Sequence, residues 1–382
     1  MPRTIIDISA LQSIPLSNVN RDDTGSPKTA SYGGVTRARV SSQAWKRAAR
    51  LAFNETLDPS EVGIRTKRIV ELLGERIAAK DPSLDTASAE ALAKQTINAA
   101  GIKTTEPRTA KGAAPKPEEA GYLLFVSGQQ LEQLADAALE AAASEDPVAA
   151  LKAAGLKQKL DTKHSIDIAL FGRMVAELTD LNVDASAQVA HALSVHQVQN
   201  EFDYFTAVDD HKANDEEEDA GAGMIGTVEF NSSLLYRYAT VDVDALHRTL
   251  ANGDATSTDA TARAVASFVD AFVRSMPTGK QNTFANRTLP DAVVISVRDT
   301  QSVNLVGAFE QPVDFAGNRL QQASEKLRKH AQGIDEAYGT TPVASWVVHP
   351  GESADALDAL GEKVSLADAV AALGTTVAAR LA

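Results

Sequence analysis

A basic segment near the amino terminus contains the residue types that bind phosphate. Residues 20–50 combine a loop lysine, Lys28, with a Gly-Gly turn, alternating arginines and a basic helix that begins at serine. Lysine, arginine and hydroxyl side chains, together with the amide groups at a helix start, are the groups with which proteins hold nucleic-acid phosphates. The segment therefore predicts a binding site for a polyanion.

The charge of this segment differs from that of the whole chain. The first 50 residues contain eight Lys or Arg and three acidic residues, a balance of +5, whereas the 382-residue chain has a net charge of −14 at pH 7. Proteins that bind nucleic acids without specificity are usually basic overall. The contrast predicts a local site in an otherwise acidic protein.

The basic helix is predicted to have one cationic and one apolar face. Residues 43–53 have helical spacing, and Ser41 or the serine after it is a suitable N-cap. Lys46 and Arg50 are four residues apart and share a face, while Trp45 points toward the core.

Composition and motifs exclude several kinds of site. The chain has no cysteine, which excludes disulfides, thiolate metal sites and a cysteine nucleophile. Its seven histidines contain no His-x-x-x-His pair, and there is no Walker loop or Gly-x-Ser-x-Gly elbow. We therefore expect no metal and no cofactor.

The amino terminus is unlike a signal peptide and no apolar run approaches about 18 residues, so we expect a cytoplasmic protein with no membrane partner.

The remaining sequence predicts an α+β fold. Apolar patterns predict strands at residues 5–8, 35–40, 292–297, 303–309 and 344–349, and helices at residues 265–276 and about 317–333. Residues 55–198 are strongly helical in pattern, apart from a proline-containing loop at 104–121, and read as an insertion. Residues 202–241 contain two β-rich arms around an acidic tip, which predicts a long hairpin. The order of strands and helices is that of a split βαβ sandwich, whose free sheet face binds RNA in some domains.

The order and spacing of several motifs carry a family resemblance. The first is Asn20-Arg-Asp-Asp, then Gly25 to Lys28, Gly33-Gly34 and Arg37-x-Arg39-x-Ser41-Ser42-Gln43-x-x-Lys46-Arg47. Further motifs follow at residues 167–174, 190–198, 203–210, 226–230 and 236–239. Together they resemble the CasC family, the repeated backbone subunit of the type I-E CRISPR Cascade complex within the RAMP superfamily.

The resemblance implies a right-hand-like protein with three parts. A modified RNA-recognition (ferredoxin-like) palm would comprise residues 1–54 and 228–382, with a helical fingers insertion at 55–200 and a β-hairpin thumb at 201–227. Several copies would polymerise along one CRISPR guide RNA and present it for pairing with target DNA in antiviral defence. The implied partners are the guide RNA, target DNA through the guide, further copies of the protein and other Cascade subunits.

The resemblance also implies which residues contact the guide RNA. They are Arg21 and Lys28 from the loop, Ser41, Gln43, Lys46 and Arg50 from the capped helix, Met174 from the fingers, and Tyr204, Phe205 and Thr206 at the thumb base. The tip, Asp215 to Asp219, is too acidic to touch a guide, and we expect it to face a protein neighbour or solvent.

Two pairs of acidic residues leave an enzymatic alternative open. Asp22-Asp23 and Asp209-Asp210 are of the residue type that holds a divalent metal for phosphodiester cleavage. Backbone subunits of type III CRISPR complexes cut target RNA with an acidic residue, so the alternative is a metal-dependent ribonuclease that cuts complementary target RNA. The competing interpretation is that these acids cap turns or pair with arginines. The type I-E resemblance favours a non-catalytic protein.

Overall fold

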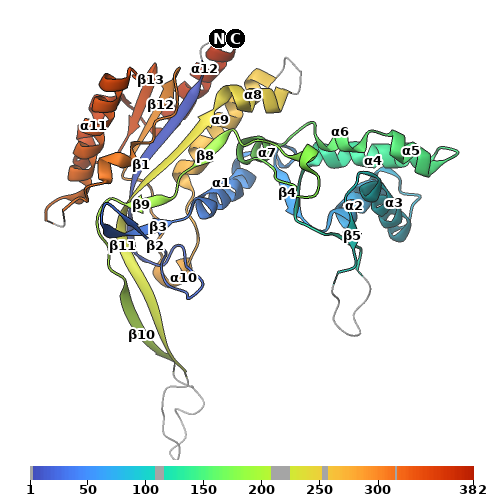
Figure 1. Ribbon diagram of the computed structural model, residues 1–382, viewed down its shortest axis with the longest axis horizontal. Coiled ribbons are helices and arrows are strands. Elements are labelled where there is room, and N and C mark those ends of the chain that lie inside the picture. Colours follow the sequence, from blue (N-terminus) through green and yellow to red (C-terminus); the bar gives the residue numbers. More distant parts are fainter. Residues whose placement is uncertain (1–2, 108–115, 208–223, 252–256, 315) are drawn as a thin grey trace, which may run out of the picture. The chain divides into compact units, whose positions relative to one another are not determined.

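The computed structural model describes residues 3–107, 116–207, 224–251, 257–314 and 316–382 (Figure 1). The chain divides into two compact units. Unit 1 comprises Met1–Ala52, Val189–Thr240 and Phe268–Thr376, and unit 2 comprises Phe53–Gln188, Val241–Ser267 and Val377–Ala382.

A large mixed sheet forms the centre of unit 1. Its main path runs β14-β13-β12-β1-β11-β9-β3-β2, and β8 and β10 also pair with β11. These strands are β1 Ile5–Ser17, β2 Thr29–Tyr32, β3 Val35–Val40, β8 Ala187–Val189, β9 Ala192–Ser194, β10 Glu201–Ala207, β11 Met224–Asp242, β12 Ala292–Arg298, β13 Ala344–Val348 and β14 Glu362–Lys363. β1 and β12, and β12 and β13, pair antiparallel, whereas β13 and β14 are parallel.

One face of this sheet is covered by α11 (Arg319–Tyr338), as Figure 1 shows. Buried sheet residues such as Leu11 and Val294 cluster with Ala323 and Leu327 of α11. Those two helix residues are four apart, so one stripe of α11 faces the sheet. The predicted helix in this region is confirmed and extends beyond its predicted end.

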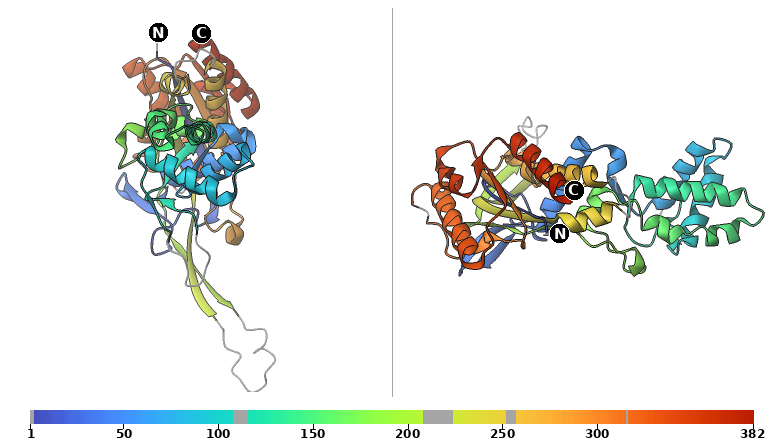
Figure 2. Two further views of the ribbon diagram at one scale, coloured as in Figure 1. Left: turned by 90° about the vertical axis from the view of Figure 1, so that its right-hand side faces the viewer. Right: turned by 90° about the horizontal axis from the view of Figure 1, so that it is seen from above.

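The predicted hairpin is also confirmed. β10 pairs antiparallel with the first part of β11 from Glu201 opposite Phe230 to Ala207 opposite Met224. Figures 1 and 2 show these strands extending beyond the rest of the sheet of unit 1. The acidic residues Asp215 to Asp219 and the pair Asp209-Asp210 lie outside the described residues.

The strand predicted at residues 303–309 is wrong. The segment forms a 3-10 helix, η4, at Leu305–Phe309. The side chain of Asn304 accepts a hydrogen bond from the amide of Val306 at 3.0 Å and so starts the turn. Both end residues of η4 are buried, which explains why the segment has the apolar pattern of a strand.

Unit 2 is predominantly helical, as its sequence pattern predicts. Its helices are α2 Ile69–Lys80, α3 Thr86–Ala99, α4 Gly128–Ala142, α5 Pro147–Ala153, α6 Leu156–Leu160, α7 Ile166–Phe171 and α8 Val243–Ala251. Two short ladders accompany them, β4 Gly63–Thr66 with β7 Leu124–Ser127, and β5 Thr104–Thr105 with β6 Glu119–Ala120. The start of α4 has a capping box in which Ser127 and Gln130 exchange side-chain and backbone hydrogen bonds.

The remaining helical segments are α1 Ser42–Thr56, α9 Ser257–Arg274, α10 Gln281–Phe284, α12 Leu366–Leu381, η1 Pro59–Glu61, η2 Thr179–Leu181 and η5 Glu352–Leu360. The helices described include none whose length and apolar character would suit a membrane span. Unit 2 includes residues 241–267 and 377–382, which the sequence analysis groups with the second part of the palm. The palm, fingers and thumb boundaries themselves stay predictions.

Candidate nucleic-acid interface

The basic helix α1 begins at a well-formed N-cap. The hydroxyl of Ser41 accepts a hydrogen bond from the amide of Ala44 at 3.3 Å, which identifies Ser41 as the capping residue. The amide of Ser41 in turn donates to the side-chain oxygen of Asn20 at 2.9 Å. The helix start is therefore tied to the loop that carries the other predicted phosphate ligands.

The two predicted faces of α1 are confirmed. Trp45 and Ala49 are each 1% exposed and form the apolar side. Gln43 is exposed, and Lys46 and Arg50 are half-buried, one turn apart on an adjacent side. The helix can therefore present two cations to a polyanion while its apolar side remains in the core.

A buried arginine of β11 holds the apolar side of α1 in place. The guanidinium of Arg237 lies 3.7 Å from the ring centroid of Trp45 and 4.5 Å from that of Phe272 in α9. It donates to the side-chain oxygen of Gln12 in β1 at 2.6 Å and to the carbonyl oxygen of Phe272. Burial lowers the pKa of Arg237 to about 9, so the group still carries its charge at neutral pH. This contact fixes α1 to the sheet.

The loop before β2 is held to both α1 and the hairpin. The side-chain amide of Asn18, which is 1% exposed, donates to the carbonyl oxygens of Gly25 and Glu229, both at 2.9 Å. The amide of Lys28 donates to the carbonyl oxygen of Asn20 at 2.9 Å. Because Glu229 belongs to β11, the loop, the cap of α1 and the base of the hairpin form one hydrogen-bonded frame.

This frame places Arg21 and Lys28 at the surface of unit 1. Arg21 is exposed and Lys28 is half-buried. Lys28 lines a small pocket together with polar residues such as Asn20 and Ser233, the basic Arg39, and apolar residues such as Ile14, Val40 and Leu235. The structure thus links Lys28 to the cap of α1 through Asn20, which accepts hydrogen bonds from the amides of both Lys28 and Ser41.

In the first acidic pair, Asp22 accepts hydrogen bonds from its own loop. One carboxylate oxygen of Asp22 accepts hydrogen bonds from the amide of Thr24 at 2.9 Å, its hydroxyl at 2.7 Å and the amide of Ser26 at 3.0 Å. These hydrogen bonds, first that of the Thr24 hydroxyl, lower the pKa of Asp22. The interpretation that Asp22 caps its turn is confirmed.

The two arginines of β3 have different roles, although both belong to the basic segment that is predicted to bind phosphate. Arg37 is 0% exposed. Its guanidinium donates to four backbone carbonyl oxygens, those of Tyr32, Ser194, Phe309 and Glu310, at 3.0, 3.1, 2.9 and 3.4 Å. Arg37 therefore joins β2, β9 and η4 and is not available to a ligand, whereas Arg39 is partly exposed.

Arg39 and His191 form a pair that the sequence-based site does not include. The Nδ1 atom of His191 accepts from the amide of Ser42 at 3.3 Å and lies 3.4 Å from a guanidinium nitrogen of Arg39. Partial burial, followed by the positive charges of Arg39 and Lys28, lowers the pKa of His191. The motif Ala190-His191-Ala192 was the available signal, but only the fold places it beside α1.

The three predicted hairpin residues do not share one face. Side chains alternate between the two faces of a strand, and residues directly opposite each other in a ladder share a face. Tyr204, opposite Thr227, and Thr206 therefore lie on one face, and Phe205, opposite Gly226, lies on the other. Tyr204 is 63% exposed and Phe205 is half-buried. The hairpin offers two different surfaces to its partners.

Met174 of unit 2 is exposed, although a methionine in an apolar setting is usually a core residue. Its side chain is 83% exposed. The residues on either side of it, Arg173 and Val175, are buried, and Arg173 donates to the carbonyl oxygen of Leu181 at 2.6 Å. The anchored neighbours hold Met174 in solvent, where it can contact a partner.

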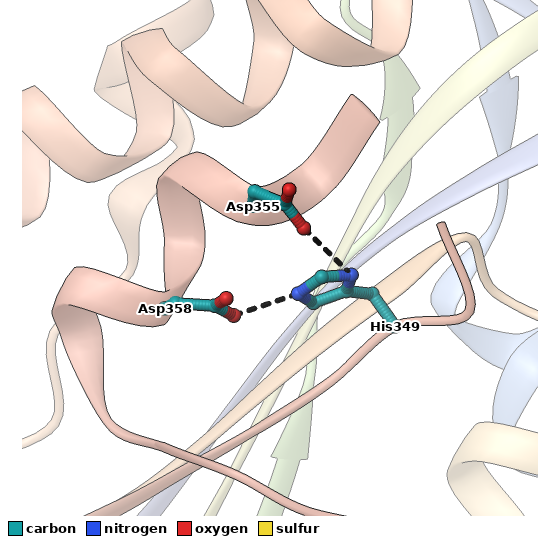
Figure 3. Close-up of side chains that lie close together, drawn as sticks. All are labelled: His349, Asp355 and Asp358. Atoms are coloured by element: carbon teal, nitrogen blue, oxygen red, sulfur yellow. Dashed lines mark hydrogen bonds and ion pairs between the residues drawn. The ribbon is translucent and has the colours of Figure 1, made fainter. Parts of the chain in front are cut away.

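A separate cluster near the carboxyl terminus contains the residue types of a metal site. The side chains of His349, Asp355 and Asp358 lie close together (Figure 3). The Nε2 atom of His349 lies 2.7 Å from Asp358, while its Nδ1 atom donates to the carbonyl oxygen of Gly351 at 2.9 Å and lies 3.9 Å from Asp355. Figure 3 shows the two carboxylates beside different ring nitrogens. The group therefore fastens η5 to the segment after β13 and does not converge on one point.

Comparisons with known proteins show the family to which the chain belongs. Residues 6–372 match the model of the family described as CT1975-like protein. The chain belongs to the CT1975-like protein family. No curated protein matches it significantly.

Two solved structures resemble this CT1975-like protein over nearly its whole length. A chain from a structure titled "CRISPR RNA-guided surveillance complex, pre-nicking" is 34% identical, with a TM-score of 0.82, and the match covers 98% of this chain and 99% of that one. A chain from a "CRISPR RNA-guided surveillance complex" is 29% identical, with a TM-score of 0.70 and coverage of 96% and 99%.

Proposed function

We propose that this protein is a guide-RNA-binding backbone subunit of a CRISPR surveillance complex. The observation that carries the proposal is the match over 98% of the chain, at a TM-score of 0.82, to a chain of an RNA-guided surveillance complex. The cationic side of α1 and the loop with Lys28 supply groups that bind phosphate without reading bases. The guide RNA, by base pairing, would read the target sequence.

The finer assignment is to the CasC family of type I-E Cascade. The motif from Asn20 to Arg47 supports it, because the structure ties the parts of this motif together through Asn20 and Ser41. In this assignment unit 1 contains an RNA-recognition-like palm, most of unit 2 is the fingers and the β10–β11 hairpin is the thumb. The partners are guide RNA, target DNA paired to the guide, further copies of the protein and other Cascade subunits, in the cytoplasm.

The assembly is proposed to grow head to tail along the guide. A surface on one copy then meets a different surface on the next, which produces a helical array. The exposed side chain of Met174 and the half-buried ring of Phe205 are proposed to meet a displaced base from two different copies. Stacking of this kind is worth roughly 1 to 3 kcal/mol per base.

Light scattering on a guide-length RNA tests this assembly. The full chain is expected to form regular arrays, and deletion of residues 207–223 is expected to leave a folded protein that binds short RNA weakly without forming arrays. The deletion removes the end of the hairpin and leaves the frame at its base, which Asn18 holds through Glu229. Arrays of equal length from both proteins would show that the thumb does not organise assembly.

We propose further that the protein is not catalytic. The use of one Asp22 oxygen by three hydrogen bonds within its own turn supports this, since a metal would have to compete with them. Incubation of the assembled complex with complementary RNA and magnesium is expected to leave the RNA intact. Cleavage that disappears in Asp22→Ala or Asp23→Ala would establish the ribonuclease alternative.

A further inference from the structure

The ring of Phe205 lies directly against Gly226 on the neighbouring strand. A Cβ atom added at Gly226 would lie 2.4 Å from Cζ of Phe205, 2.7 Å from its Cε1 and 3.2 Å from its Cε2. The three nearest atoms all belong to this ring. The two residues are also directly opposite each other in the β10–β11 ladder. The ring therefore covers the glycine and occupies the place of its missing side chain.

The backbone of Gly226 does not by itself require glycine. Gly226 does not have a positive φ angle, so residues with a side chain can adopt the same backbone conformation. A glycine inside a strand weakens the strand and often marks a close approach by another group. Here the approaching group is the Phe205 ring. Glycine is needed at this position because any side chain would occupy the space that the ring fills.

The face that carries Phe205 is anchored to the rest of unit 1. Phe230 lies on the same face of β11, four residues after Gly226. Its ring packs against that of Phe284 in α10, with 5.8 Å between centroids and an angle of 50°. The orientation of this face, and with it the direction in which Phe205 points, is therefore set from the base of the hairpin.

We propose that Gly226 is a positioning residue that holds the Phe205 ring flat on the hairpin with one side open for stacking on an RNA base. The proposal rests on the proposed function of the protein as an RNA-binding subunit. The ring is half-buried, with its outer end over Gly226, so part of its surface remains accessible. A ring that is already fixed loses little freedom when a base stacks on it, which favours binding.

Gly226→Ala tests the proposal with little risk to the fold. The added atom meets the far end of a side chain that can rotate away, so the variant displaces the ring and leaves the backbone in place. Full-chain protein is titrated with a guide-length RNA that carries 2-aminopurine, a base whose fluorescence is quenched on stacking. The variant is expected to lose quenching and to bind about 5- to 140-fold more weakly for each base that loses its contact. Gly226→Ser is expected to lose at least as much.

A double-mutant cycle separates positioning from a structural role. In a Phe205→Leu background, Gly226→Ala is expected to have no further effect, because there is no ring to displace. For the single variant Gly226→Ala, the slope of log affinity against log salt should equal that of wild type, since no phosphate contact is lost. Gly333→Ala in α11, where an added Cβ atom meets nothing within 4 Å, is the matched control.

The outcomes distinguish this inference from the proposed function. Wild-type quenching and affinity in Gly226→Ala, or an equal loss in the Phe205→Leu background, would overturn the positioning role. A wild-type protein that does not bind guide-length RNA at all would instead refute the proposed function.

Discussion

Replacing Lys46 and Arg50 together by alanine tests whether α1 presents its cationic side to a nucleic acid. The two residues are one turn apart, half-buried, and lie on a side of the helix adjacent to that of the buried Ala49 and Trp45. Alanine is the strongest helix former, so the substitution preserves α1 and removes two positive charges. The contact of Trp45 with Arg237, which holds the helix to the sheet, is left intact.

The size of the effect follows from the number of phosphate contacts. Each contact to a single strand contributes about −0.7 to the slope of log affinity against log salt, so loss of two should flatten the slope by about 1.4. Over a fourfold rise in salt, wild type should therefore lose about sevenfold more affinity than the variant.

Fluorescence anisotropy measures this slope directly. The RNA is a single strand short enough to bind one copy of the protein, and salt is varied from about 50 to 200 mM. Lys329→Ala is the control, because Lys329 in α11 is a 67% exposed cation that pairs with Glu325 away from α1. An unchanged slope in the double variant, with a wild-type melting temperature, would remove both residues from the interface.

Substitutions at Arg237, His164 and Gly279 test contacts within the two units. Arg237→Lys is expected to lower the free energy of unfolding by about 2 to 4 kcal/mol, because lysine cannot stack between two rings while donating to two acceptors. Chemical denaturation should show a smaller loss for Arg237→Met, which leaves no buried charge, and equal losses would contradict the account. Burial, followed by Arg173, lowers the pKa of His164 from 6.5 to about 4, so the folded protein keeps this ring neutral while the unfolded chain takes up a proton below pH 6.5. The contribution of His164 to the free energy of unfolding should be fully present above pH 6.5 and should fall by about 3 kcal/mol as the pH approaches 4. Thermal melting of His164→Asn should show a correspondingly weaker dependence on pH. The same pH dependence in both proteins would refute this prediction. Gly279→Ala would bring a Cβ atom within 2.1 Å of the carbonyl oxygen of Val19. Because that obstacle is backbone, the loop with Lys28 must move, and we expect weaker RNA binding and a loss of about 1 to 3 kcal/mol in stability; anisotropy and denaturation at wild-type values would contradict this.

Local patterns in the sequence were sufficient to predict the elements that position the site. The helix with Lys46 and Arg50 and the hairpin are confirmed because each has a clear period and, for the helix, a clear cap at Ser41. The apolar run at residues 303–309 was read as a strand because a buried 3-10 turn and a buried strand have similar composition. Only the cap at Asn304 distinguishes them, and such caps are also common in loops.

Which residues lie at the site could not be predicted from local patterns, because it depends on contacts between segments that are distant in the sequence. Arg37 and Arg39 are equivalent in sequence, yet carbonyl groups from β9 and η4 surround only Arg37. His191 comes beside α1 through the pairing of β9 with β3, which no local pattern reveals. The separation of Tyr204 and Phe205 onto opposite faces, in contrast, follows from strand alternation and was predictable from the sequence.

Sequencing the nucleic acid that copurifies with the protein from its host tests the central claim most directly. If the protein is a guide-binding subunit, this nucleic acid should be RNA of one length class, with segments common to all molecules at the ends and variable sequence between them, as expected of CRISPR guides. Lys46→Ala/Arg50→Ala should carry less of this RNA than wild type. A protein purified intact without nucleic acid, or with DNA or unrelated cellular RNA, would contradict the proposal that it is a guide-binding backbone subunit.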